Sequence, residues 1–447
     1  MNLLAEAAEW ICGVSASRTP PEVVSRVQTL LLYTLTLAVA SHDETDALWL
    51  AARRASTGGG RSALLVTGER WSAENAAFIN AVIGCRRGQN DTYPAATAHA
   101  GCIVVPAVLA LARERGLGGA AVLDALLVGY EALPKLAADI APVIVKRGFR
   151  ATGVFGPLIA AAAASRLIGL SAAQTAHALA IATMHSGGTM QCWEEGTPEW
   201  RLQVANASRS GIVAAKLAEA GATAAAGSLD GNSGLYKVYA GAVPAIDFNG
   251  WKLRDTVVKP YPGCLINQAA VYMVNRIMNR ESLASSTVEA VTVTLSEANA
   301  RYPGIDQYGP FLQPTGAIMS MAFMVETALE DGTVRMSHFN ERHAEHPVHK
   351  ASRRVTLRSD PGLPQWGCRV RMVTRSGQVF EDEAADQSMF ALGWQDTVDL
   401  LGGVVDEWPV PDAGQRFKGL TEAVSALAEQ GEVDSFGAFC MRASAGG

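Results

Sequence analysis

From the N-terminus to about residue 245, apolar residues recur at the spacing of an α-helix, and this pattern limits the possible folds more than any other feature of the chain. In the segment Pro20–Ala40, for example, Val23 and Val27 fall on one helical face. Ser171, followed three residues later by Gln174, is typical of a capped helix start. A pattern of this kind, continued over such a length, predicts an all-α domain.

The pattern changes further along the chain. Three segments alternate as strands do, and a helical pattern lies between the first two at Ala317–Leu329. The three segments are Val288–Leu295, Arg353–Arg358 and Arg369–Thr374. After about residue 388 the pattern is helical again. We therefore predict a mainly α fold, in which residues 1–253 and 388–447 form a large helical domain and residues 254–387 form an inserted, smaller α+β lid domain. Binding sites commonly form in the crevice between two such domains.

The composition argues against several classes of protein. Of the 447 residues, 49% are hydrophobic and 18% are charged, which is too apolar for a disordered chain. The net charge of −6 and the lack of a basic stripe argue against a nucleic-acid partner. The longest uncharged apolar run, near Gly153–Ser165, is too short to span a membrane. Seven scattered cysteines and the lack of a basic leader segment predict a reduced, cytoplasmic protein.

Several motifs that would point to a known chemistry are missing. The sequence contains no phosphate-binding loop, dinucleotide fingerprint or nucleophile elbow, so kinase, oxidoreductase and serine-hydrolase functions are not favoured. Four histidines lie close together, but Pro347 interrupts their spacing and charged residues surround them. They are His338, His343, His346 and His349. We expect them to lie in a solvated loop and expect no metal site.

A polar loop between two apolar helices carries Asp91, Thr92, Thr97 and His99. Because apolar helices flank this loop, its side chains could converge on a cavity. His99 lies just before the next helix, where the helix dipole disfavours an imidazolium ion and favours a bound anion. The alternative is that Asp91 and Thr97 only cap and brace the loop.

Four other segments could contribute to a binding site. Arg150 precedes a long apolar helix, where a cation and the helix amides can bind an anion together, although a solvated charged turn is the alternative. Arg201 could clamp a carboxylate or simply pair with a nearby glutamate. Lys259 and Tyr261 lie in a proline-rich turn at the predicted domain boundary and could face the crevice. His185 precedes a glycine-rich turn and could border the cavity.

Taken together, these segments resemble the MmgE/PrpD family along nearly the whole chain. The likeness rests on the order and spacing of Asp91-Thr92, His99-Ala100-Gly101, Arg147-Gly148-Phe149, Ala151-Thr152-Gly153, Gly211-Ile212 and Lys259-Pro260-Tyr261-Pro262. The resemblance implies a helical domain with a smaller lid domain, a homodimer and no cofactor. It also implies proton transfer next to a carboxylate of a small di- or tricarboxylic acid, with loss of water or carbon dioxide or with inversion.

The resemblance also assigns roles to individual residues. His99 is expected to donate or accept the proton, while Asp91 and Thr92 orient His99 and the substrate. Lys259 and Arg150 are expected to bind or polarise a carboxylate. The remaining members of the expected substrate site are Arg201, Trp200, Tyr261, Cys264 and His185. We therefore expect a cofactor-free lyase that acts on a small carboxylate-bearing substrate. An epimerase, a double-bond isomerase and a homologue that only binds a ligand are the alternatives.

The chain departs from the family pattern at the expected site. Trp200 stands where the family has a lysine, and Arg150 and Cys264 stand where members have histidines. Gly88 replaces a family acidic residue. These changes reduce the capacity to bind several carboxylates and add a large apolar face. We therefore expect a substrate with fewer carboxylates than the citrate-like substrates of the family, or a bulkier and more apolar one.

Overall fold

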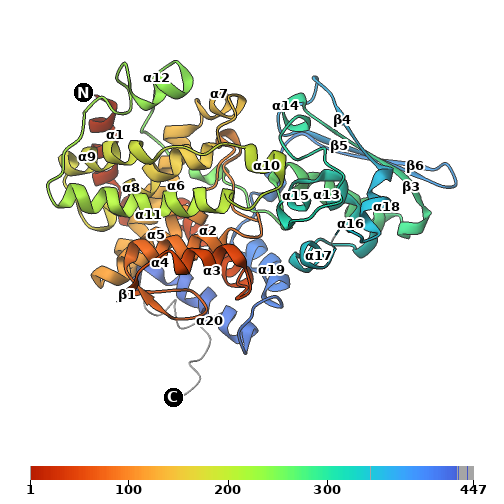
Figure 1. The fold of residues 1–447 in the computed structure, drawn as a ribbon, viewed down its shortest axis with the longest axis horizontal. Coiled ribbons are helices and arrows are strands. Elements are labelled where there is room, and N and C mark those ends of the chain that lie inside the picture. The colour runs from red at the N-terminus through yellow and green to blue at the C-terminus, as the bar shows by residue number, and fades with distance from the viewer. Residues whose placement is uncertain (1, 343, 430, 432–439, 441–447) are drawn as a thin grey trace.

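The structure is a computed structural model that describes residues 2–342, 344–429, 431 and 440. A body of packed helices lies beside a second body that contains a small sheet (Figure 1). The helices of the first body are α1 (Leu3–Gly13), α2 (Pro21–Ala40), α3 (Ala47–Arg54), α4 (Ala73–Gly84), α5 (Gly101–Arg115), α6 (Gly119–Ala137), α7 (Ala141–Lys146), α8 (Ala151–Leu167), α9 (Ala172–Ala182), α10 (Gln191–Glu195), α11 (Trp200–Glu219) and α12 (Leu235–Ala240). A fold that is mainly α is therefore confirmed.

Helix α8 is the centre of the helical body, because every residue in it except Arg166 is buried. Helices α5, α6, α9 and α11 all pack against it. Small side chains allow this close packing: a Cβ atom added at Gly156 would lie 2.7 Å from the Cβ atom of Ala207 in α11. The packing fixes the N-terminal ends of α5 and α8, and these ends lie beside the candidate site described below.

The second body contains a four-stranded sheet in the order β4-β3-β5-β6, with only the β3–β4 pair parallel. Its strands are β3 (Val288–Leu295), β4 (Val355–Ser359), β5 (Cys368–Thr374) and β6 (Val379–Ala384). Its helices are α13 (Leu265–Arg280), α14 (Glu297–Ala300), α15 (Pro314–Met319), α16 (Met321–Asp331), α17 (Met336–Glu341) and α18 (Val348–Ala351). Helices α13 and α16 pack against the strands, which buries alternate residues such as Val291 and Val293.

The chain then returns to the helical body. Helices α19 (Trp394–Val405) and α20 (Ala413–Ser425) both pack on α2, so segments from both parts of the chain share one core (Figure 1). Among the described helices, α2 alone is long and apolar enough to cross a bilayer, and 78% of its most apolar window is buried within the fold. A core helix passes the same test, so this finding is weak support for a membrane span.

Three details differ from the sequence predictions. The segment Ala317–Leu329 forms two helices, because the Ser320 hydroxyl accepts the backbone N–H of Phe323 (3.1 Å) and starts a new helix, α16. The amphipathic pattern of Ser208–Ala220 predicts a helix over those residues, but the observed helix, α11, begins earlier, at Trp200. A small hairpin, β1 (Gly58–Ala63) and β2 (Arg70–Trp71), lies within the part of the sequence that reads as helical.

Candidate active site

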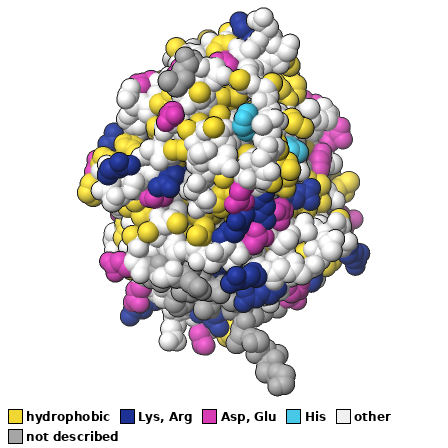
Figure 2. Space-filling view, turned by 90° about the vertical axis from the view of Figure 1, so that its left-hand side faces the viewer, with side chains coloured by type: hydrophobic (Ala, Val, Ile, Leu, Met, Phe, Trp, Pro, Cys, Tyr) yellow, Lys and Arg dark blue, Asp and Glu magenta, His cyan; other side chains and the backbone are white. Residues whose placement is uncertain are grey.

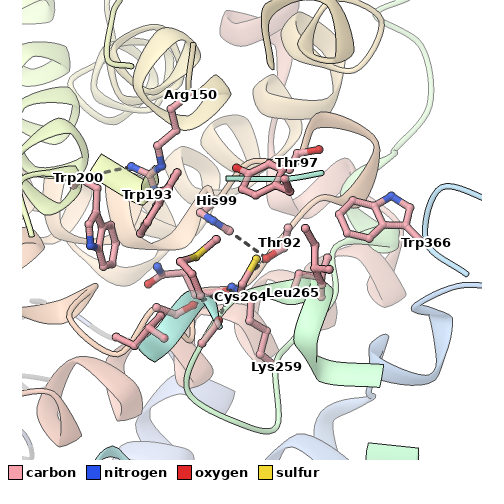
Figure 3. A pocket seen from close by; sticks show the side chains of 17 residues that line it. Thr92, Thr97, His99, Arg150, Trp193, Trp200, Lys259, Cys264, Leu265 and Trp366 are labelled. Carbon is pink, nitrogen blue, oxygen red and sulfur yellow. Dashed lines mark hydrogen bonds between the residues drawn. The ribbon is translucent and has the colours of Figure 1, made fainter. Parts of the chain in front are cut away.

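A cavity of about 540 Å³, counting its mouth, lies where the helical body meets the segment that leads into α13 (Figure 3). Its polar lining comes from both sides of this junction: Asn90, Thr92, Thr97, His99, Arg150, Lys259, Cys264 and Tyr302. The apolar lining includes three tryptophans, Trp193, Trp200 and Trp366. The structure thus brings His99, Arg150 and Lys259 to one cavity, although distant segments supply them.

Backbone hydrogen bonds hold the two principal loops of the site together. The N–H of Thr92 donates to the carbonyl of Val257 (2.9 Å), and the N–H of Val257 donates to the carbonyl of Thr92 (2.8 Å). The buried Tyr33 hydroxyl lies 2.8 Å from the Gln89 carbonyl and accepts the N–H of Lys259 (2.9 Å). The Gln89 side chain also donates to the Lys259 carbonyl (2.9 Å). Lys259 is therefore fixed against the loop that carries His99.

The geometry around His99 determines its tautomer. Its Nδ1 atom lies 3.0 Å from the Asp91 carbonyl oxygen and 3.1 Å from the Thr92 hydroxyl oxygen. A carbonyl oxygen can only accept, and the Thr92 hydroxyl itself donates to the Asn90 carbonyl (3.1 Å). Nδ1 therefore carries the hydrogen, and Nε2 has the free lone pair in the neutral ring. Burial, then the charges of Lys259 and Arg150, hold the pKa of His99 well below 6.5, so the neutral ring is the form present at pH 7.

Asp91 supports His99 without lining the cavity. Its carboxylate oxygens accept the Gly101 N–H at the start of α5 (3.1 and 3.3 Å), while its carbonyl accepts from His99. Burial raises the pKa of this carboxyl to about 7, although the Gly101 hydrogen bond and the charge of Lys259 oppose the shift. Asp91 is thus a positioning residue, and the brace that the sequence left as an alternative is present.

Two buried cations line the cavity without a carboxylate partner among the described residues. The Lys259 ammonium group donates to the carbonyls of Gly88 (2.7 Å) and Gly263 (3.2 Å), and burial lowers its pKa to about 8. The Arg150 guanidinium donates to the Trp200 carbonyl (3.2 Å) and lies over the rings of Trp193 and Trp200, 5.6 and 5.4 Å from their centroids (Figure 3). Buried charges of one sign are costly without a counter-ion, so this arrangement favours a bound anion.

Three predicted site residues lie outside the lining of this cavity. Arg201 forms a bidentate ion pair with Asp46 (2.8 and 2.9 Å), so its partner is neither a substrate nor the neighbouring glutamates. The Tyr261 hydroxyl accepts a hydrogen bond from the Asn275 side chain (3.2 Å). His185 is exposed at the end of a short 3₁₀ turn. Contacts between residues that are distant in the sequence determine where these side chains lie, and no local sequence pattern indicates such contacts.

Cys264 and Trp200 do line the cavity. Burial raises the pKa of the Cys264 thiol above its usual value, so the thiol is neutral at pH 7. Three aromatic lining residues have no role in the sequence prediction: Trp193, Tyr302 and Trp366. No local sequence pattern marks these three residues, because only the fold brings their segments to the cavity.

The described residues contain no group of three or more His, Cys, Asp or Glu side chains that could hold a metal ion. Of the four clustered histidines, His343 lies outside the described residues. His349 is buried and lies edge-on to Phe311, so it is a packed residue and not part of a solvated loop.

This combination of a helical body, a sheet-containing body and a cationic cavity with a single histidine agrees with the family resemblance. The sequence matches the MmgE/PrpD N-terminal domain over residues 5–245 and the MmgE/PrpD C-terminal domain over residues 261–389. The chain belongs to the MmgE/PrpD family.

Curated relatives carry one activity in their names. The cis-aconitate decarboxylase-like protein oryM of Aspergillus oryzae is 30% identical over 53% of this chain and 49% of its own length. The chain therefore matches about half of that relative. Human cis-aconitate decarboxylase is 27% identical over 84% of this chain and 82% of its own length. The Aspergillus terreus cis-aconitate decarboxylase is 25% identical over 76% of this chain and 74% of its own length.

The brace between Asp91 and α5 leads to a stability prediction for Gly101→Ala. The new Cβ atom would lie 2.5 Å from Asp91 Oδ1 and 2.6 Å from the Tyr130 hydroxyl, so the site loop has to move. We expect a loss of about 1–3 kcal/mol in the free energy of unfolding, measured in urea. Gly402→Ala, on an exposed face of α19 with open space around it, is the control and should gain up to about 1 kcal/mol. Equal stabilities of the two variants would contradict the brace.

The pKa of Lys259 predicts how anion binding depends on pH. Because Lys259 loses its charge as pH rises through about 8, the affinity for succinate should fall by about tenfold or more between pH 7 and 9.5. Asp91 ionises near pH 7 and weakens anion binding in the same direction. The Lys259→Arg variant keeps its positive charge over this pH range. Its affinity for succinate should therefore show only the part of the pH dependence that is due to Asp91. Calorimetric titration measures both, with the exposed Lys237→Arg as control. An unchanged pH dependence in Lys259→Arg would remove Lys259 from the anion site.

Proposed function

We propose that this protein is a cofactor-independent lyase that acts on a small carboxylate-bearing substrate by proton transfer at the carbon next to a carboxylate. The observation that carries the proposal is the shared cavity of one neutral histidine and two buried cations that lack carboxylate partners among the described residues. The names of the relatives, which are cis-aconitate decarboxylases, support a lyase. We further propose that it is a cytoplasmic homodimer, as the resemblance implies.

The chemistry follows from the charges in the cavity. A bound carboxylate offsets the charges of Lys259 and Arg150, so the imidazolium form of His99 becomes less costly and the pKa of His99 rises. Nε2 can then take a proton from the carbon next to the carboxylate, and the two cations stabilise the enediolate that forms. In a dehydration, the electron pair of the enediolate then expels hydroxide from the neighbouring carbon. His99 returns its Nε2 proton to this hydroxide, which leaves as water.

Decarboxylation uses the same groups in another order. The bond to a carboxylate carbon breaks, carbon dioxide leaves, and its electron pair stays on the adjacent carbon. His99, which takes up a proton from solvent once the bound carboxylates have raised its pKa, then gives this Nε2 proton to that carbon. Lys259 and Arg150 hold the developing charge in both reactions.

The assignment of His99 is tested with His99→Ala. We expect kcat to fall by roughly 10²- to 10⁴-fold, because the group that transfers the proton is lost, while the unfolding free energy changes little. The assay is turnover of a panel of hydroxy and unsaturated di- and tricarboxylic acids, including cis-aconitate, followed by mass spectrometry. His185→Ala, an exposed histidine outside the cavity, is the control and should keep full activity. Persistent turnover in His99→Ala would exclude the assigned role.

An epimerase is the second candidate, since Cys264 and Tyr302 line the same cavity and could supply a second acid or base. Incubation in deuterated water distinguishes the two functions. A lyase gives a product that has lost the mass of water or carbon dioxide, and this is the result we expect. An epimerase would instead place deuterium in recovered substrate of unchanged composition, which would contradict the lyase.

A further inference from the structure

The charges that line the cavity indicate how many carboxylates a ligand carries. Arg150 and Lys259 are 4% and 1% exposed, and the described lining contains no Asp or Glu. Their hydrogen bonds go to backbone carbonyls, which carry only partial charge. His99 contributes no charge in its neutral form. Asp91 lies behind His99 and offsets only part of the charge of Lys259. The unbalanced charge therefore corresponds to a ligand with two carboxylates.

The rest of the cavity is apolar. Trp193, Trp200 and Trp366 form part of the wall, together with Leu265 and Ile318. Trp200 is 1% exposed, and its ring lies 5.1 Å from that of Trp193. A third carboxylate against this wall would lose its water without gaining a cation, which is unfavourable, whereas a hydrocarbon group would gain contact.

Trp200 also separates the cavity from another pair of cations. Trp200 and Ile318 line a second hollow beside the cavity, which contains Arg86 and Arg201. Both arginines are already paired with Asp46, at 3.1 and 2.8 Å, and Arg86 also pairs with Asp43 (3.0 Å), so two carboxylates face two cations. A substrate carboxylate that reached past Trp200 would therefore meet a cluster whose charges are balanced.

We infer that the cavity selects a dicarboxylic acid that carries a hydrocarbon substituent, and that Trp200 is the residue that excludes a third carboxylate. This inference rests on the proposed function for the location of the site, but it concerns binding and needs no turnover. It deepens that proposal by naming the substrate class, which differs from the tricarboxylate named in the relatives.

Calorimetric titration of the wild-type protein at pH 7 tests the inference with four unreactive probes. They are 2-isobutylsuccinate, succinate, 4-methylpentanoate and propane-1,2,3-tricarboxylate. We expect isobutylsuccinate to bind at least about tenfold more tightly than each of the others, since only it supplies both two carboxylates and a hydrocarbon group. If the tricarboxylate or the monocarboxylate bound as tightly as isobutylsuccinate, the inference would be overturned.

The role of Trp200 is tested with Trp200→Lys, which adds a cation to the wall. We expect propane-1,2,3-tricarboxylate to gain about tenfold or more in affinity and isobutylsuccinate to lose as much. Asn206→Lys adds the same charge to α11 outside the cavity and should change neither affinity. An unchanged preference in a folded Trp200→Lys protein would contradict the role of Trp200. If that variant does not fold, Trp200→Phe must keep the wild-type preference for the hydrocarbon-bearing dicarboxylate, and its loss would count against the inference.

These outcomes separate the inference from the proposed function. Selective binding of the substituted dicarboxylate without lyase turnover of any such acid would leave the inference standing and reject the lyase. Lyase turnover of a tricarboxylate that binds more tightly than the dicarboxylates would support the lyase and reject the inference.

Discussion

The pair of backbone hydrogen bonds between Thr92 and Val257 is the contact on which the site depends, because it joins a loop of the helical body to the segment that leads into the sheet-containing body. The Tyr33 hydroxyl reinforces it from α2 by binding backbone groups on both loops. Without this junction His99 and Lys259 would belong to separate surfaces. The packing of the two bodies therefore fixes the position of the His99 imidazole relative to the Lys259 ammonium group.

The positive charges that line the cavity are unfavourable in the free protein, and this favours the binding of an anionic ligand. Burial destabilises the charged forms of both Lys259 and His99, the charge of Lys259 adds to the cost at His99, and the charge of Arg150 adds to the cost at both residues. Each group keeps hydrogen bonds only to neutral oxygen atoms. A bound dianion relieves these costs together, so binding and activation of His99 are linked: the charge that holds the substrate also makes protonation of the ring less costly.

The sequence predicted the fold better than the site, for physical reasons that individual residues show. Periodicity predicted the helices and strands because burial of one face is a local property, and it failed at Ser320, where one hydroxyl starts a new helix. His99 and Arg150 could be selected because each precedes a buried apolar helix, and Lys259 because it lies in a proline-rich turn at the predicted domain boundary. Arg201 could not be excluded, since its partner Asp46 is remote in sequence. Trp366 could not be found, because only the fold brings its loop to the cavity.

Two groups of contacts hold the site, and they can vary separately. His99 is fixed by Asp91 and Thr92, and Asp91 is fixed by Gly101, all within the loop before α5 and its first residue. Arg150 instead depends on the start of α11, through the Trp200 carbonyl and the Trp200 ring. Under the proposed function, a change at the start of α11 therefore alters which acid fits, while the hydrogen bonds that hold His99 are retained.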